Sequence, residues 1–173
     1  MRFLVYIIAF LFIVSFNNQS FAEEKIVFLN VNYVFNNSIS GKEANKSIGK
    51  KIKKLESDVN QFSKTINVEK EKLIKQKNIL SEDDFKKNLI NIDNKVKEFN
   101  NKIKIRKEEI NTLQNQARSN FIIELKNILS EFSSKNSIQI IIKQEDILIG
   151  SKKLDITNDI LKIVDSNKIK LIK

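Results

Sequence analysis

Two long series of apolar residues run through the middle of the chain, at alternating gaps of four and three positions. The first consists of Ile48, Ile52, Leu55, Val59, Phe62, Ile66, Leu73 and Leu80, and the second of Phe85, Leu89, Ile92, Val96, Phe99, Ile103, Ile110, Leu113 and Ala117. Polar Glu69, Gln76 and Arg106 stand at three further positions of the same spacing. This spacing is typical of a coiled-coil seam. It predicts two long helices. Arg106 is a polar residue in the seam, which either sets the register of the two helices or marks a place where their packing is loose.

The two series are out of phase, and this requires a break between them. A slip of two residues turns the apolar stripe by roughly 200°, so one straight helix would not present both stripes to the same partner. Near the slip, Ser81 is a good N-cap, and Asp84 stands where a capping box places its carboxylate. We therefore predict an antiparallel hairpin over residues 42–132 with its tip near 78–84. The folded-back register pairs Leu80 with Phe85, Leu73 with Ile92, Ile66 with Phe99, Phe62 with Ile103, Leu55 with Ile110 and Ile52 with Leu113.

The two flanks of the hairpin read as parts of one small body. Residues 25–31 and 137–143 are β-rich, residues 147–149 are a candidate third strand, and residues 33–35 suit the start of a helix. Asp155 or Thr157 is expected to cap a last helix that carries apolar residues 160, 161, 163 and 164. The nearly continuous apolar strands suggest burial on both faces. The fold class is α+β, with a body of residues 23–41 and 133–173.

The second arm is expected to enter this body at its base. After Ala117 the apolar spacing changes to a run in which extra apolar residues, Ile122, Ile123 and Leu129, widen the stripe. The run consists of Phe121, Leu125, Ile128 and Phe132. A core this small, in a chain without cysteine, favours oligomerisation as a source of stability.

The first 22 residues read as an export signal. Met1 and Arg2 precede an apolar run over residues 3–14, and residues 20–22 resemble a small-x-small cleavage site, so the mature chain would begin near Glu23. The alternative is a retained membrane anchor, but a span needs about 20 apolar residues and polar residues cut this run short.

The amino-acid composition argues against several classes of function. Three glycines and no proline fit few turns and long helices. The chain has neither histidine nor cysteine, which removes the commonest general base, the thiol nucleophile and the usual zinc ligands. We therefore expect no enzyme, no cofactor and no metal site. A formal charge of +10 favours acidic partners, such as anionic lipid, lipopolysaccharide or negatively charged client proteins.

The ordered set of features resembles the Skp/OmpH family of periplasmic chaperones. The set comprises the export signal, the strand at 25–31 with Tyr33 to Phe35, the charged hairpin with Leu80 to Asp83 at its tip, the strand at 138–142 and the closing stretch 155–162. The Asp155-Ile156-Thr157 start of that stretch is the most distinctive piece. The resemblance implies a homotrimer whose arms surround a cavity, where unfolded outer-membrane proteins are held without ATP. The family's lipopolysaccharide site has no unambiguous counterpart here.

Candidate client contacts lie off the seam, because seam residues face the partner arm. Four apolar residues fall on outer positions: Val68, Ile74, Ile90 and Ile105. They are either client contacts or a by-product of an isoleucine-rich composition. The basic surface of the arm consists of Lys64, Lys70, Lys72, Lys75, Lys77, Lys86, Lys87, Lys102, Lys104 and Lys107. These lysines solvate the helices and are also expected to attract acidic clients over a range of about 10 Å at 0.1 M salt.

The reading that follows is a periplasmic holdase with no enzymatic activity. One rival is a structural coiled-coil protein of the envelope, retained by its N-terminal apolar segment. A second rival is a basic nucleic-acid binder, which an exported protein would seldom be because it seldom meets nucleic acid.

Overall fold

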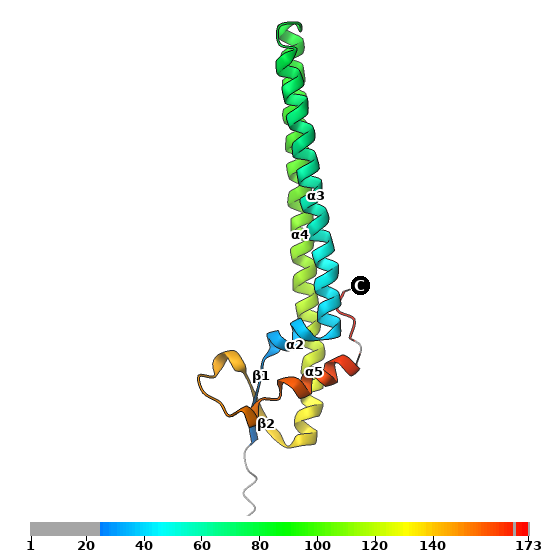
Figure 1. Cartoon of the computed structure of the whole chain (residues 1–173). Coiled ribbons are helices and arrows are strands. Elements are labelled where there is room, and N and C mark those ends of the chain that lie inside the picture. Colours follow the sequence, from blue (N-terminus) through cyan, green and yellow to red (C-terminus); the bar gives the residue numbers. More distant parts are fainter. Residues whose placement is uncertain (1–24, 168, 173) are drawn as a thin grey trace, which may run out of the picture.

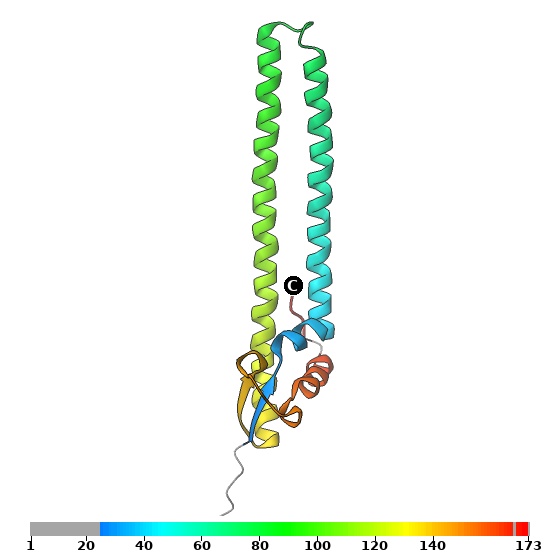
Figure 2. The ribbon, with the colours of Figure 1, turned by 60° about the vertical axis from the view of Figure 1, so that its left-hand side comes forward.

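The computed structural model describes residues 25–167 and 169–172. A long hairpin, formed by α3 (Ile39–Lys75) and α4 (Glu82–Asn136), rises from a small body (Figures 1 and 2). The body contains β1 (Lys25–Leu29), α2 (Val31–Asn37), β2 (Ile138–Lys143) and α5 (Thr157–Ser166). Two short 3-10 turns, η1 (Gln144–Asp146) and η2 (Lys152–Leu154), lie between β2 and α5. The predicted α+β class with a projecting helical hairpin is confirmed. The predicted signal segment, residues 1–22, lies outside the described residues.

Most of the predicted seam is buried or partly buried between α3 and α4. The buried seam residues are Ile48, Leu55, Ile66 and Leu73 on α3 and Ile92, Ile110 and Ala117 on α4. Two predicted seam residues are instead exposed, Val59 at 38% and Leu89 at 43%. Next to Val59, the partly buried Asp58 carboxylate reaches across to Arg106, so an ion pair joins the two helices at this level.

The tip of the hairpin lies close to its predicted place. Helix α3 ends at Lys75 and α4 begins at Glu82, so the turn starts two residues before the predicted residue 78. Ser81 caps α4: its Oγ accepts a hydrogen bond from the Asp84 backbone N–H at 3.1 Å and donates one to Asp84 Oδ2 at 2.6 Å. The first turn of α4 also holds three acidic side chains, which suit the positive end of the helix dipole. The predicted pairing of Ser81 and Asp84 is confirmed.

The body is held together across the whole length of the chain. Strands β1 and β2 are parallel, with Ile26 opposite Ile140 and Leu29 opposite Lys143. A parallel pair needs a crossover connection, and here the entire hairpin is that connection. The other side of β1 is bridged by the segment before α5, where the Ile156 N–H donates to the Phe28 carbonyl at 3.0 Å.

The predicted third strand at residues 147–149 is wrong for the single chain. The segment follows η1 as irregular backbone and pairs with no strand among the described residues. Its side chains Leu148 and Ile149 are almost fully exposed. Burial of both sheet faces is likewise not observed in the single chain, since Ile140 on β2 is half exposed. A strand needs a neighbour for its backbone groups, and the single chain offers none on this side.

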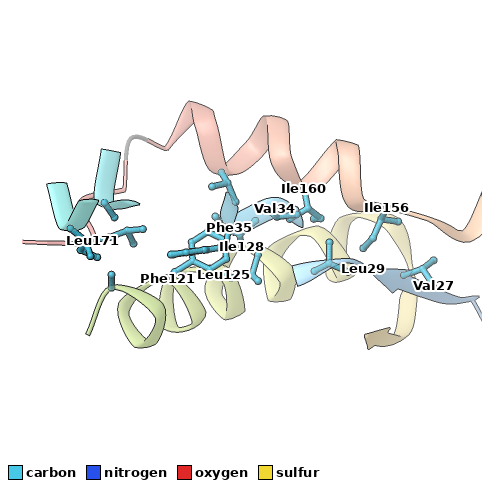
Figure 3. Close-up of a cluster of buried hydrophobic side chains, with 14 of the residues drawn as sticks. Val27, Leu29, Val34, Phe35, Phe121, Leu125, Ile128, Ile156, Ile160 and Leu171 are labelled. Carbon is cyan, nitrogen blue, oxygen red and sulfur yellow. The ribbon is translucent and has the colours of Figure 1, made fainter. Parts of the chain in front are cut away.

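The core of the body forms around the base of α4. Phe121, Leu125 and Ile128 point into a cluster with Val34 of α2 and Ile160 of α5 (Figure 3). The Phe35 ring packs edge-on against Phe121, with centroids 5.1 Å apart and an interplanar angle of 76°. The prediction that the base of the second arm enters a conventional core is therefore confirmed. Of the three residues expected to widen the stripe, Leu129 packs against the core, whereas Ile122 and Ile123 are exposed.

A tight corner joins the body to the arm. Buried Ser38 caps α3, and its Oγ accepts from the Gly41 backbone N–H at 3.1 Å. A Cβ on Gly41 would lie 1.7 Å from the Phe35 carbonyl oxygen, so only glycine lets α2 and α3 approach this closely. The corner directs α3 away from the body from its first turn.

Candidate functional site

The four apolar residues predicted to lie off the seam are all exposed on the arm. The exposed fractions are 64% for Val68, 66% for Ile74, 52% for Ile90 and 54% for Ile105. None of the four belongs to the two buried clusters of the described residues. The coiled coil therefore does not need them for its own packing. Their placement agrees with the expectation, while their role in binding stays a prediction.

Two ion pairs between α3 and α4 set which residues of the two helices lie opposite each other. Lys95 Nζ lies 2.8 Å from Glu69 Oε2, and Arg106 Nη1 lies 2.5 Å from Asp58 Oδ2. The acidic partners and the basic partners are each 11 residues apart, so the register stays constant between the two pairs. Of the two roles expected for Arg106, the one that its contacts support is the setting of register.

This register places exposed apolar residues at matching levels on the two helices. Ile74 on α3 is level with Ile90 on α4 near the tip, and Val59 is level with Ile105 halfway along the arm. All four side chains are exposed. Three of the four off-seam residues, together with Val59 of the predicted seam, therefore lie at two levels of the hairpin, whereas Val68 has no exposed apolar residue opposite it.

The mid-arm level has a shallow hollow with aromatic and basic walls. Phe62 stacks on Phe99 with ring centroids 3.8 Å apart and an interplanar angle of 8°. The predicted partners were Ile103 for Phe62 and Ile66 for Phe99, so the stack joins diagonal neighbours of that register. The hollow is about 560 Å³ and is lined by Phe62, Phe99, Lys102, Ile103, Ile105 and Arg106, together with polar residues of α3. An extended segment of another chain would find both apolar contact and positive charge here.

The ten lysines predicted for the basic arm surface are all exposed. Within residues 25–167 and 169–172, the ion pairs of the arm are made by Lys95, Arg106 and Lys135, and none is made by these ten lysines. Their charges therefore face solvent. Charge that is not neutralised by neighbours acts on ligands over about a Debye length, which is about 10 Å at 0.1 M salt.

The tip carries one exposed apolar residue that the spacing argument missed. Ile79 lies in the turn between α3 and α4 and is 83% exposed. Heptad phase ranks residues only within a helix, so a residue inside the break escaped it. The signal available in the sequence was an isoleucine within a turn that is otherwise mainly polar.

The body presents a second exposed apolar region, along the free edge of the sheet. β2 pairs only with β1 in the described chain, so its other edge is open. Exposed Ile140, Leu148 and Ile149 belong to β2 and to the loop that follows it. An open edge with apolar side chains is a template for pairing with another chain.

Neither a cluster of metal ligands nor a membrane-spanning helix is found in the part of the chain that the structure describes. No cluster of three potential metal ligands occurs among those residues. None of their helices combines the length and the apolar composition that a membrane crossing needs.

Comparison with known proteins identifies the family of this chain. The family model described as "Outer membrane protein (OmpH-like)" matches residues 25–164. The chain belongs to the OmpH-like family. Membership of this family supports a chaperone role, as the resemblance in sequence implied. A search of curated proteins finds no match.

A solved structure shares the fold of this OmpH-like chain. It is the crystal structure of a candidate outer membrane chaperone, described as OmpH-like, from Caulobacter crescentus CB15. The TM-score is 0.79 and the sequence identity is 16%, over 88% of this chain and 89% of that one. At this identity the likeness shows the fold alone. The family match ends at Val164, so the last residues of the chain lie outside it.

Proposed function

We propose that this OmpH-like protein is an ATP-independent periplasmic holdase, which binds unfolded outer-membrane β-barrel proteins and prevents their aggregation in transit. The observation that carries the proposal is the exposure of Val68, Ile74, Ile90 and Ile105 on an arm that does not need them for packing. Unfolded chains expose apolar side chains, and burying these against the arm removes both surfaces from water. Family membership supports the same role.

The contacts in such a complex are individually weak and many. A single exposed isoleucine buries little area, but several arms holding one client make each further contact intramolecular. The 21 lysines and arginines of residues 42–132 add long-range attraction, which salt weakens. A holdase built in this way releases its client without ATP when folding at the membrane competes for the same side chains.

A homotrimer, with bodies joined and arms around a cavity, is the assembly that we propose. The open edge of β2 and the exposed side chains of Ile140, Leu148 and Ile149 support it. A neighbouring chain would supply hydrogen-bond partners for segment 147–149, the segment that the sequence suggested as a strand. Replacing Leu148 and Ile149 by serine should lower the molar mass measured by sedimentation equilibrium, and an unchanged mass would contradict this interface.

We also propose that the protein is exported and that residues 1–22 are removed. The intact mass of the exported protein should correspond to a chain that begins near Glu23. A mass that retains the N-terminal segment would instead favour the anchored structural protein.

The test of the holdase is an aggregation assay. A urea-unfolded β-barrel protein is diluted with and without the mature protein, and light scattering and complex mass are measured at low and high salt. We expect scattering to be suppressed at stoichiometric excess, less so at high salt because the lysine contribution is screened. Aggregation that proceeds unchanged at both salt concentrations would refute the proposal.

A pair of matched variants locates the binding surface. The first replaces Val68, Ile74, Ile90 and Ile105 by serine, which removes apolar area without touching the seam. The control replaces four exposed asparagines on the same helices by serine: Asn60, Asn67, Asn91 and Asn101. Both should keep the helical circular dichroism of the parent protein, and only the first should lose protection. Equal protection by both variants would move the client site elsewhere on the molecule.

A further inference from the structure

Residues 169–172, here called the tail, lie outside the family match, yet they pack against the base of the arm. They run beside the start of the hairpin in both views (Figures 1 and 2). Leu171 is 3% exposed, and Ile169 and Ile172 are partly buried against the same core. A freely solvated end would not bury apolar side chains in this way.

The end of α5 and the tail bind both helices of the hairpin. Asp165, near the end of α5, accepts a hydrogen bond from the Ile39 backbone N–H at 2.8 Å, at the first residue of α3. The Asn120 Nδ2 on α4 donates to the Leu171 carbonyl at 3.0 Å. Asp165 therefore contacts α3 and Leu171 contacts α4, both at the base of the hairpin.

Small side chains on the hairpin make room for the tail. Ser40 and Ala44 are buried on the first turns of α3, and Ala117 is fully buried on α4. These residues are too short to fill the space between the helices at this level, and Leu171 belongs to the same core cluster as Ala44 and Ala117. Figure 3 shows Leu171 at one end of this cluster. A hollow of about 490 Å³ remains between α3 and the tail. The tail therefore fills part of the space that these short side chains leave.

We propose that the tail is a strap, which fastens α3 to α4 at the base of the hairpin and limits how far the arm moves relative to the body. Leu171 and Asn120 are the positioning residues of this strap. In a holdase the strap would also limit how wide a client the arms admit. That consequence rests on the proposed function, whereas the strap itself does not.

Hydrogen exchange of the full chain, without any client, tests the strap. In Leu171→Ala the amides of residues 39–48 and 113–121 should exchange roughly tenfold faster, while those of β1, β2 and the tip should keep their rates. Asn120→Ala should give a smaller change in the same segments. Lys170→Ala, at an exposed neighbour of Leu171, is the control, and Leu171→Met should restore most of the protection.

Two results would overturn the strap. If Leu171→Ala leaves residues 39–48 unchanged, the tail does not hold the hairpin. If exchange rises equally in β1 and β2, Leu171 is an ordinary core residue with no local role at the arm. Since no client is present, neither result depends on whether the protein is a holdase.

Arm motion provides a second readout. The chain contains no cysteine, so Lys77→Cys at the tip and Lys152→Cys in the body give two unique sites for fluorescent dyes. Doubly labelled protein mixed with excess unlabelled protein reports the distance within one chain. The distribution of tip-to-body distances should be broader in Leu171→Ala than in Lys170→Ala, and identical distributions would refute a limit on arm motion.

Discussion

A buried residue of the arm faces one partner helix, whereas Phe121 in the body packs against Phe35 of α2 and belongs to a cluster to which β1, α2 and α5 all contribute (Figure 3). The arm repeats one contact many times along about 55 Å of helix, and each contact is separable from the next. The body gathers segments from both ends of the chain around one cluster. Loss of one arm contact should therefore have a local effect, and loss of one body contact a global effect.

The two regions also differ in what they leave exposed. The arm exposes apolar residues at two levels between lysines, and the body exposes them along a sheet edge and the loop that follows. Exposed apolar side chains set among lysines suit a mobile, variable partner, while an open strand edge suits a partner of fixed backbone geometry. This contrast is why we assign clients to the arm and self-association to the body.

The largest effect is expected at the centre of the body. Phe121→Ala removes a 1% exposed ring and its edge contact with Phe35, so the free energy of unfolding should fall by about 3–5 kcal/mol. Urea denaturation followed by circular dichroism measures it. The matched control is exposed Ile123→Ala on the same helix, with an expected change within about 0.5 kcal/mol. A loss at Phe121 below about 1 kcal/mol would contradict a single cooperative core.

A smaller and local effect is expected in the seam of the arm. Leu73→Ala removes a buried side chain near the tip and should cost about 2 kcal/mol, since the narrow seam allows partial collapse. Native-state hydrogen exchange should show faster exchange around residues 66–92 and unchanged rates in β1 and β2. Exposed Ile74→Ala is the neighbouring control. Faster exchange throughout the body would show that arm and body unfold together, and that the loss of an arm contact is not local.

The smallest effect is expected at the tip. Ser81→Ala removes the hydroxyl that accepts from the Asp84 N–H, and should destabilise the start of α4 by about 1 kcal/mol. Ser81→Asn should retain most of the cap. Ser63→Ala, at an exposed site within α3, serves as the control for the loss of a hydroxyl. Equal exchange rates at residues 82–86 in Ser81→Ala and in the parent protein would show that the turn holds without its cap.

The hairpin was predictable because its signals are local. The spacing of apolar residues predicted the seam, and Ser81 with Asp84 predicted the cap that the structure contains. Spacing did not predict which residue fills each place across the seam. Asp58 pairs with Arg106 while Val59 is exposed, and Phe62 stacks on Phe99, a diagonal neighbour of its predicted partner Ile103. These choices depend on side-chain shape and charge across the two helices.

The candidate site was predictable in part. Heptad phase identified Val68, Ile74, Ile90 and Ile105 as outer positions, and all four are exposed. It missed Ile79, which lies in the turn where no helix phase applies. The grouping of apolar residues at two levels needed the cross-arm register, which the ion pairs at Glu69 and Asp58 set.

The sequence by itself determined the two arm helices, the fold-back between them and the outer positions of the apolar residues, because a helix period is a property of neighbouring residues. Only the tertiary structure decided how the body closes. The Asn30 N–H bonds to Thr157 Oγ1 at 3.0 Å across 127 residues, and the tail places Leu171 against the base of the arm. Such contacts depend on where distant segments meet in space. A local sequence pattern does not encode which distant segments come into contact. For the same reason, the pattern of residues 147–149 predicted a strand but did not show whether a neighbouring strand would be present.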